Sequence, residues 1–322
     1  MKKEKAKKET TQVKTPTAPL AKEPQMGQKQ LNTALVLGSI CLLGLLIYSN
    51  SFGCGFHLDD GSSIVENKAI QQWPSIKPIW ELSRGRFVPY LTLALNFHLG
   101  GLEVWGYHLV NLLIHLANAC LVYFFTLQLF QTPALAVEPK SANRQLIAFF
   151  AALMFVAHPL ATQSVTYIVQ RMASMLTLFY LASVYCYLKA RLLQTFSRAS
   201  LIYYGASALM AILAIFTKEN AFTLPLVVLL VEACFLQTKP LGDLLKDKRI
   251  LLAMGTIVLG LILVMSTYPM QIFAPIPPQH GHTYTVTPLN YLWTQFSVIL
   301  KYIQLLFLPL SQNLDYDYQI AK

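Results

Sequence analysis

Long apolar runs recur along the chain and are separated by short polar stretches. The first run, residues 32–50, can cross the hydrocarbon core of a bilayer, because a transmembrane helix needs about 20 apolar residues. Further runs of similar length fall near residues 106–130, 146–162, 172–190, 200–217, 221–237 and 250–269. The pattern therefore predicts seven transmembrane helices.

The run at residues 291–309 is apolar enough for an eighth span, but Gln295, Lys301 and Gln304 interrupt it. We expect a surface or re-entrant helix here, which would keep Asp315 and Asp317 on the outer side of the membrane. The predicted fold class is an all-α polytopic membrane protein with a bundle of about 7–8 transmembrane helices.

The N-terminal stretch, residues 1–31, contains many lysines among Thr, Pro and Gln and has no apolar period. These features predict a disordered basic tail in the cytoplasm, followed by a transmembrane domain over residues 32–322. A cleaved signal peptide is the alternative. The long basic segment before the first run and the lack of an A-x-A-like cleavage site argue against it.

Composition supports the membrane assignment. The 322 residues are 55% hydrophobic and 12% charged, which is too apolar for a soluble domain of this size. The formal net charge of +10 would suggest a nucleic-acid partner in a soluble protein. Here the positive charge lies mainly in the tail and in short loops, so it indicates membrane topology, and we expect no nucleic-acid partner. The five cysteines are scattered singly and predict neither a disulfide framework nor a cysteine metal site.

If the spans alternate in direction from a cytoplasmic N-terminus, three polar segments lie on the outer side of the membrane. They are the long first loop at 51–105, the segment from His158 to Arg171, and the Lys218-Glu219-Asn220 turn. Charged groups at a membrane boundary are costly unless they are paired or solvated, so this set is a candidate functional site. The alternative is that they are ordinary loop residues that face water.

Amphipathic spacing in the first outer loop predicts helices that lie along the membrane surface, and their ends would bring Arg86 towards Asp59 and Asp60. In the second span, four polar residues share one helix face. For these residues, interhelical hydrogen bonds are favoured over metal ligation, because no carboxylate is near. They are His108, Asn111, His115 and Asn118.

An ordered set of motifs resembles the membrane half of the transmembrane and tetratricopeptide-repeat O-mannosyltransferases and their bacterial relatives. The motifs are Asp59-Asp60, Arg86 with Leu91–Asn96, Trp105–His115, His158-Pro159, Thr162–Arg171, Thr217-Lys218-Glu219, and Leu308-Pro309 with Asp315–Tyr318. The residues Gln163 and Gln170-Arg171 resemble the bacterial branch of the family more than the animal branch.

The resemblance implies a glycosyltransferase of the GT-C superfamily. Its expected partners are membrane lipid, a polyprenyl- or dolichyl-phosphate sugar donor, and an extracytoplasmic protein that accepts the sugar on Ser or Thr. The expected location is a bacterial inner membrane with the active site outside, or the endoplasmic reticulum membrane in a eukaryote. The chain departs from the family in three respects: Phe87-Val88-Pro89 follows Arg86 in place of Pro-Leu, family members generally have more spans, and no repeat domain precedes Lys322.

Transfer of a sugar to a hydroxyl requires a carboxylate that takes the proton and cations that hold the departing phosphate. From the resemblance, Asp59 is the expected base, and Asp60 would bind the acceptor or hold a partner. The candidate phosphate ligands are Arg86, Arg171 and Lys218, and further site candidates are His158, Gln163, Gln170, Glu219, Asp315 and Asp317. The pattern indicates no metal or other cofactor, although it leaves a divalent cation possible.

Simpler interpretations exist for several of these residues. Asp59-Asp60-Gly61 could be only a turn, His158-Pro159 a helix cap or kink, and Lys218-Glu219 a connection between spans. A polytopic transporter is an alternative function, but it predicts polar groups threading several spans and inverted repeats, and the sequence has neither. A second alternative is a membrane scaffold without catalytic activity.

Overall fold

The computed structural model describes residues 31–136, 143–193, 197–237, 251, 255, 258, 262, 287–314 and 316. Within these residues every regular element is helical. The longer helices are α1 (Thr33–Ile47), α3 (Phe87–Gly100), α4 (Val104–Leu129), α6 (Arg144–Ala157), α8 (Arg171–Leu192), α9 (Arg198–Ile215), α10 (Leu224–Val231) and α12 (Pro288–Phe307).

Short helical segments connect the longer ones. In the first outer loop they are η1 (Ser49–Gly53), η2 (Gly61–Val65), η3 (Ile70–Gln72), α2 (Lys77–Leu82) and η4 (Arg84–Arg86). Further along the chain they are α5 (Pro133–Ala136), η6 (Pro159–Ala161), α7 (Thr162–Thr166), η7 (Ile168–Gln170), η8 (Glu219–Thr223) and η9 (Glu232–Leu236).

The described residues contain four helices that are long and apolar enough to cross a membrane, at Val104–Leu129, Ile168–Leu192, Arg198–Ile215 and Glu219–Leu236. A fifth would be the pair Arg144–Ala157 and Pro159–Thr166, which is bent by 52°. This number is smaller than the predicted seven to eight. One reason is that α1 has only 15 residues. Another is that the predicted span at 250–269 lies mostly outside the described residues, as does the basic tail up to residue 30.

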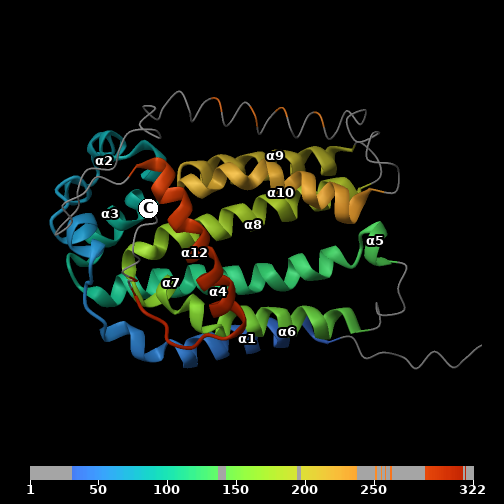
Figure 1. The fold of residues 1–322 in the computed structure, drawn as a ribbon, viewed down its shortest axis with the longest axis horizontal. Coiled ribbons are helices and arrows are strands. Elements are labelled where there is room, and N and C mark those ends of the chain that lie inside the picture. The colour runs from blue at the N-terminus through green and yellow to red at the C-terminus, as the bar shows by residue number, and fades with distance from the viewer. Residues whose placement is uncertain are drawn as a thin grey trace, which may run out of the picture. The chain divides into compact units, whose positions relative to one another are not determined.

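Helix α4 is central to the bundle, where it packs against α1, α6 and α8, while α8 also runs along α9 and contacts α10 (Figure 1). Close contact between α1 and its neighbours depends on Gly44. A Cβ at this position would collide with the Leu116 side chain and lie 2.9 Å from Val156 Cγ2. Small residues at such crossings let helices approach closely in a membrane, where packing drives association.

The polar face of α4 forms the interhelical hydrogen bonds that the sequence predicts. The Asn111 Nδ2 group donates to the Ile168 carbonyl at 3.1 Å, and the Asn118 Nδ2 group donates to the Ser174 carbonyl at 2.9 Å. His115 Nε2 lies 3.2 Å from the Val156 carbonyl oxygen, and His108 contacts two backbone carbonyls. These residues attach α4 to α6 and to the start of α8.

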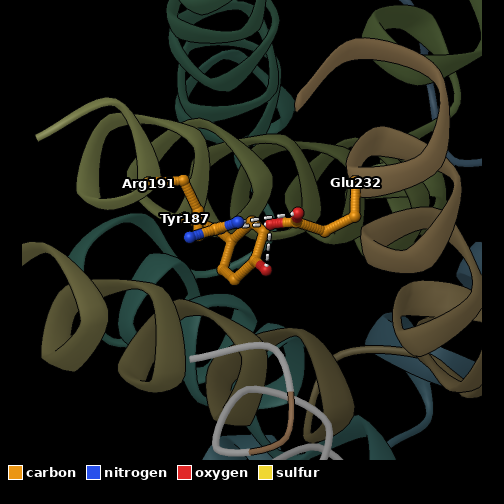
Figure 2. A network of polar contacts seen from close by, with 3 residues as sticks. All are labelled: Tyr187, Arg191 and Glu232. Atoms are coloured by element: carbon orange, nitrogen blue, oxygen red, sulfur yellow. Dashed lines mark hydrogen bonds and ion pairs between the residues drawn. The ribbon is translucent and has the colours of Figure 1, made fainter. Parts of the chain in front are cut away.

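A buried ionic network joins α8 to η9 (Figure 2). The Glu232 carboxylate accepts hydrogen bonds from Tyr187 Oη at 2.6 Å and from Arg191 Nη2 at 3.0 Å, and Arg191 Nε also contacts it. Since breaking a buried ion pair leaves an uncompensated charge, this network holds the two helices together.

Residues 51–105, the predicted first outer loop, share a hydrophobic core with the beginning of α8. Buried side chains from η2, η3, α2 and α3, together with Tyr107 of α4, pack with those of residues 167–172. The members are Ile64, Ile70, Ile79, Tyr90, Leu93, Ala94, Tyr107, Tyr167, Ile168, Val169 and Met172. Two residues of this outer-loop core contact the acid pair: Tyr167 contacts Asp59, and Val169 contacts Asp60.

Candidate functional site

Asp59 and Asp60 lie on a turn that leads into η2, and their side chains occupy opposite environments. Asp59 is exposed, whereas Asp60 is fully buried. The residue before them, Leu58, has a φ of +44°. A positive φ is uncommon for residues other than glycine and is unfavourable for a bulky side chain such as leucine. Contacts from elsewhere in the fold must therefore hold this turn in place.

The Asp60 carboxylate supplies one of those contacts. Its Oδ2 accepts the backbone N–H of His57 at 3.0 Å, and its Oδ1 accepts the backbone N–H of Val169 at 2.7 Å. Burial raises the pKa of Asp60, and the backbone N–H groups only partly offset this increase. Both carboxylate oxygens are thus engaged within the protein. Of the two roles expected for Asp60, this geometry favours holding a partner over binding the acceptor.

Arg86 and Glu219 form a second centre, where two segments far apart in the sequence meet. Arg86 Nε donates to Glu219 Oε1 at 3.1 Å, and Arg86 Nη2 donates to Oε2 at 3.4 Å. The backbone N–H of Val88 also donates to the Phe216 carbonyl at 3.1 Å, so the start of α3 is fixed to the end of α9.

Lys218 adds a second cation to this centre. It lies between α9 and η8 and is half-buried. Burial lowers the pKa of Lys218, the neighbouring Arg86 lowers it further, and Glu219 opposes the change. Arg86, Lys218 and Glu219 together carry one net positive charge at neutral pH, in a place that is accessible to solvent.

Arg171, the third expected phosphate ligand, is fully buried. Its Nε donates to Asn111 Oδ1 at 2.7 Å, Nη1 to Asn96 Oδ1 at 2.6 Å, and Nη2 to the Tyr107 carbonyl at 3.0 Å. Nη1 also contacts Thr92 Oγ1 at 3.4 Å. The guanidinium therefore connects α3, α4 and α8 inside the protein, and this geometry favours a structural role over phosphate binding.

His158 and Gln163 both contact the C-terminal part of the described chain. His158 Nδ1 accepts the Leu160 backbone N–H at 3.2 Å, so the predicted cap is confirmed, and its Nε2 donates to the Leu306 carbonyl at 3.0 Å. The Gln163 amide lies 3.3 Å from the Asn313 carbonyl oxygen. His158 thus contacts the end of α12, and Gln163 contacts the segment that follows it.

Three further candidates have no assigned contact. Gln170 is half-buried at the start of α8, and its side chain makes no hydrogen bond to another described residue. Asp315 and Asp317 lie outside the described residues. In the described part of the chain, no group of three or more His, Cys, Asp or Glu side chains is placed to hold a metal ion.

A pocket of about 290 Å³ lies between α4, α6 and α8, next to Leu306 of α12. Three hydroxyl groups line it, but Ser164, Ser174 and Thr177 donate their protons to carbonyls of their own segments. The hydroxyl oxygens can therefore offer mainly acceptors to a ligand. The lining also includes His115, Asn118 and the site candidate His158, and it contains no Arg or Lys.

The tertiary structure also reveals contacts that the sequence analysis did not assign. Tyr167 contacts the Asp59 backbone, and Asn96 and Asn111 hold Arg171. The position of Tyr167 within the polar segment His158–Arg171 is a weak sequence signal for the first contact. The pairing of Asn96 with Arg171 has no local signal, because the two residues are 75 positions apart.

Comparison with known proteins finds relatives for part of the chain. It is 32% identical over 173 residues to the protein O-mannosyl-transferase Tmtc3 of Drosophila melanogaster, which covers 47% of this chain and 19% of the relative. It is 31% identical over 194 residues to the protein O-mannosyl-transferase TMTC2 of Homo sapiens (56% and 22%). The longest of three such matches, to Tmtc2 of Drosophila melanogaster, has 28% identity over 256 residues (74% and 25%).

No family profile and no solved structure matches the chain significantly. The chain spans about a fifth to a quarter of the length of the relatives named above. These relatives are animal proteins, so the resemblance to the bacterial branch stays a prediction. The comparisons show that this helical, apolar chain is similar to part of several proteins named protein O-mannosyl-transferases.

Proposed function

We propose that the chain is a GT-C-type membrane glycosyltransferase that moves a sugar from a polyprenyl-phosphate or dolichyl-phosphate carrier to an extracytoplasmic protein. The acceptor atom is the hydroxyl oxygen of Ser or Thr. The observation that carries the proposal is the similarity to protein O-mannosyl-transferases over 47% to 74% of the chain. Asp59, Arg86 and Lys218 are the carboxylate and the cations that such a reaction needs.

Asp59 is the proposed general base. Its exposed carboxylate can reach an incoming hydroxyl, whereas that of Asp60 is buried and occupied by backbone N–H groups. In the reaction, the acceptor oxygen forms a bond to the anomeric carbon of the sugar as the bond from that carbon to the phosphate oxygen breaks. Asp59 takes the hydroxyl proton, and the bonding electron pair leaves with the lipid phosphate.

Arg86 and Lys218 are the proposed ligands of the departing phosphate. Arginine presents a fixed fork of donors that suits a phosphate, and lysine adds a compact positive charge. In the resting site, Glu219 occupies the donor fork of Arg86, at 3.1 Å and 3.4 Å. The pair is partly exposed, so Arg86 can turn towards a phosphate at a small energetic cost.

We assign different roles to the remaining candidates. Arg171 and Asp60 hold the site together from within the protein, because their polar atoms are already engaged. His158 positions the end of α12, and Gln163 positions the segment after it. The site would face the outer or lumenal side of the membrane, where lipid-linked sugars and secreted acceptors meet.

The proposal is tested by assaying the purified protein in lipid nanodiscs with dolichyl-phosphate mannose and a Ser/Thr-rich peptide. The Asp59→Asn variant should lose about 10²- to 10⁴-fold in turnover, the usual contribution of a general base. Glu66→Gln is the matched control, because Glu66 is an exposed carboxylate of the same loop without an assigned role. It should keep the activity of the unchanged protein.

Two results would contradict the proposal. If Asp59→Asn retains full turnover, Asp59 is not the base. If the unchanged protein transfers neither mannose nor glucose from dolichyl-phosphate or polyprenyl-phosphate carriers, the non-catalytic scaffold is favoured.

A further inference from the structure

Tyr167 lies between α7 and η7, and its ring is part of the outer-loop core with 5% of the residue exposed. Its hydroxyl is at the edge of this core and accepts the backbone N–H of Asp59 at 3.0 Å. The two residues are 108 positions apart, so only the tertiary fold brings them together. A buried, rigid ring is well suited to hold the hydroxyl at one place.

A second contact fixes the same turn from the same segment. Two residues after Tyr167, the backbone N–H of Val169 donates to Asp60 Oδ1 at 2.7 Å. The stretch 167–169 therefore contacts both members of the acid pair, one through a side chain and one through the backbone. These contacts compensate for the unfavourable φ of +44° at Leu58.

The hydroxyl proton of Tyr167 remains available after the oxygen has accepted the Asp59 N–H. Burial raises the pKa of Tyr167 to about 12, with further contributions from the negative charges of Asp59 and Asp60. The hydroxyl therefore keeps its proton at neutral pH.

We propose that Tyr167 is the positioning residue for Asp59, holding its backbone so that the carboxylate faces the acceptor hydroxyl. This inference rests on the proposed function, in which Asp59 is the base. Tyr167 does not touch the reacting atoms. It acts by fixing the backbone from which the exposed Asp59 side chain extends.

The test compares Tyr167→Phe with Tyr123→Phe in the nanodisc assay. Tyr123 is also fully buried, and its hydroxyl has no hydrogen-bond partner among the described residues, so the control removes a buried hydroxyl without removing a contact. Tyr167→Phe should lower kcat about 10- to 100-fold, as expected for a misplaced catalytic group, and leave the KM for dolichyl-phosphate mannose within about twofold. Tyr123→Phe should change neither.

A purely structural role for the hydroxyl would reduce the folded fraction and leave the kcat of the folded protein unchanged. Thermal unfolding of both variants measures that fraction. The inference is overturned if Tyr167→Phe has the kcat of the control while Asp59→Asn is inactive, a result that leaves the proposed function intact. Failure of the proposed function gives a different result, in which the unchanged protein shows no turnover, and the inference then fails with it.

Discussion

Two Arg–Glu pairs in this protein have the same chemistry and different surroundings. Arg86 and Glu219 join the outer loop to η8, and 42% and 39% of their side chains are exposed. Arg191 and Glu232 join α8 to η9, with 11% and 1% exposed. Tyr187 donates a further hydrogen bond to Glu232, whereas the outer pair has Lys218 as its neighbour.

Exposure decides what each pair can do. A buried pair cannot exchange its partner, because opening it would leave a charge in an apolar environment. A partly exposed pair gains little from its mutual attraction, since water competes for both groups, so an anion can displace the carboxylate. Arg191–Glu232 is therefore suited to a structural link, and the exposure of Arg86–Glu219 supports the proposal that Arg86 binds a phosphate.

The largest expected effect follows from breaking the buried pair. Glu232→Ala removes the acceptor of Tyr187 and Arg191 and should destabilise the protein by about 3–5 kcal/mol. Thermal or denaturant unfolding in detergent measures the change. A loss of less than about 1 kcal/mol would show that the buried Arg–Glu pair contributes no more to stability than an exposed pair does.

The second prediction concerns the cation beside the outer pair. Because the pKa of Lys218 is below its ordinary value, the ammonium loses its proton at a lower pH than free lysine does. Donor binding should therefore weaken as the pH rises, already below the ordinary lysine range of about 10.4. A pH profile of kcat/KM would show this alkaline decline.

Lys218→Arg is the matched variant for this profile, since arginine stays charged throughout the accessible pH range. The decline should disappear or move to higher pH. If the profile of the variant is the same as that of the unchanged protein, Lys218 is not the titrating cation.

The smallest expected effect is on the stability contributed by the outer pair. Glu219→Ala should change the free energy of unfolding by only about 0–1 kcal/mol, because the ion pair is partly exposed. The same unfolding assay that is used for Glu232→Ala provides the comparison. A loss similar to that of Glu232→Ala would indicate that the outer pair is a structural link as well.

Much of the helical framework could be predicted from the sequence. Apolar runs near 106–130, 200–217 and 221–237 coincide with described helices, and the polar face of α4 forms the expected hydrogen bonds. These features depend on local composition and on the helical period, which a sequence displays directly. The number of spans was harder to predict, since α1 is short and the chain bends at Pro159.

The candidate site could be predicted only in part. The motifs identified Asp59, Arg86, Lys218 and Glu219 as outer polar residues, and the fold brings Arg86 and Glu219 into contact across 133 positions. Sequence reasoning grouped Arg171 with the phosphate ligands because a charge near a membrane boundary suggests function. In the structure its guanidinium is enclosed by oxygens from α3 and α4, which no local pattern reveals.

The sequence alone thus determined the class of the protein, an apolar helical chain with its polar motifs at identifiable positions, because hydropathy and helical period are local properties. Only the tertiary structure decided which charged side chains are exposed to solvent and which are buried and paired. It buries Asp60 and Arg171 and leaves Asp59 exposed beside Tyr167. Burial and pairing depend on side chains that are far apart in the sequence, so they arise only when the helices pack.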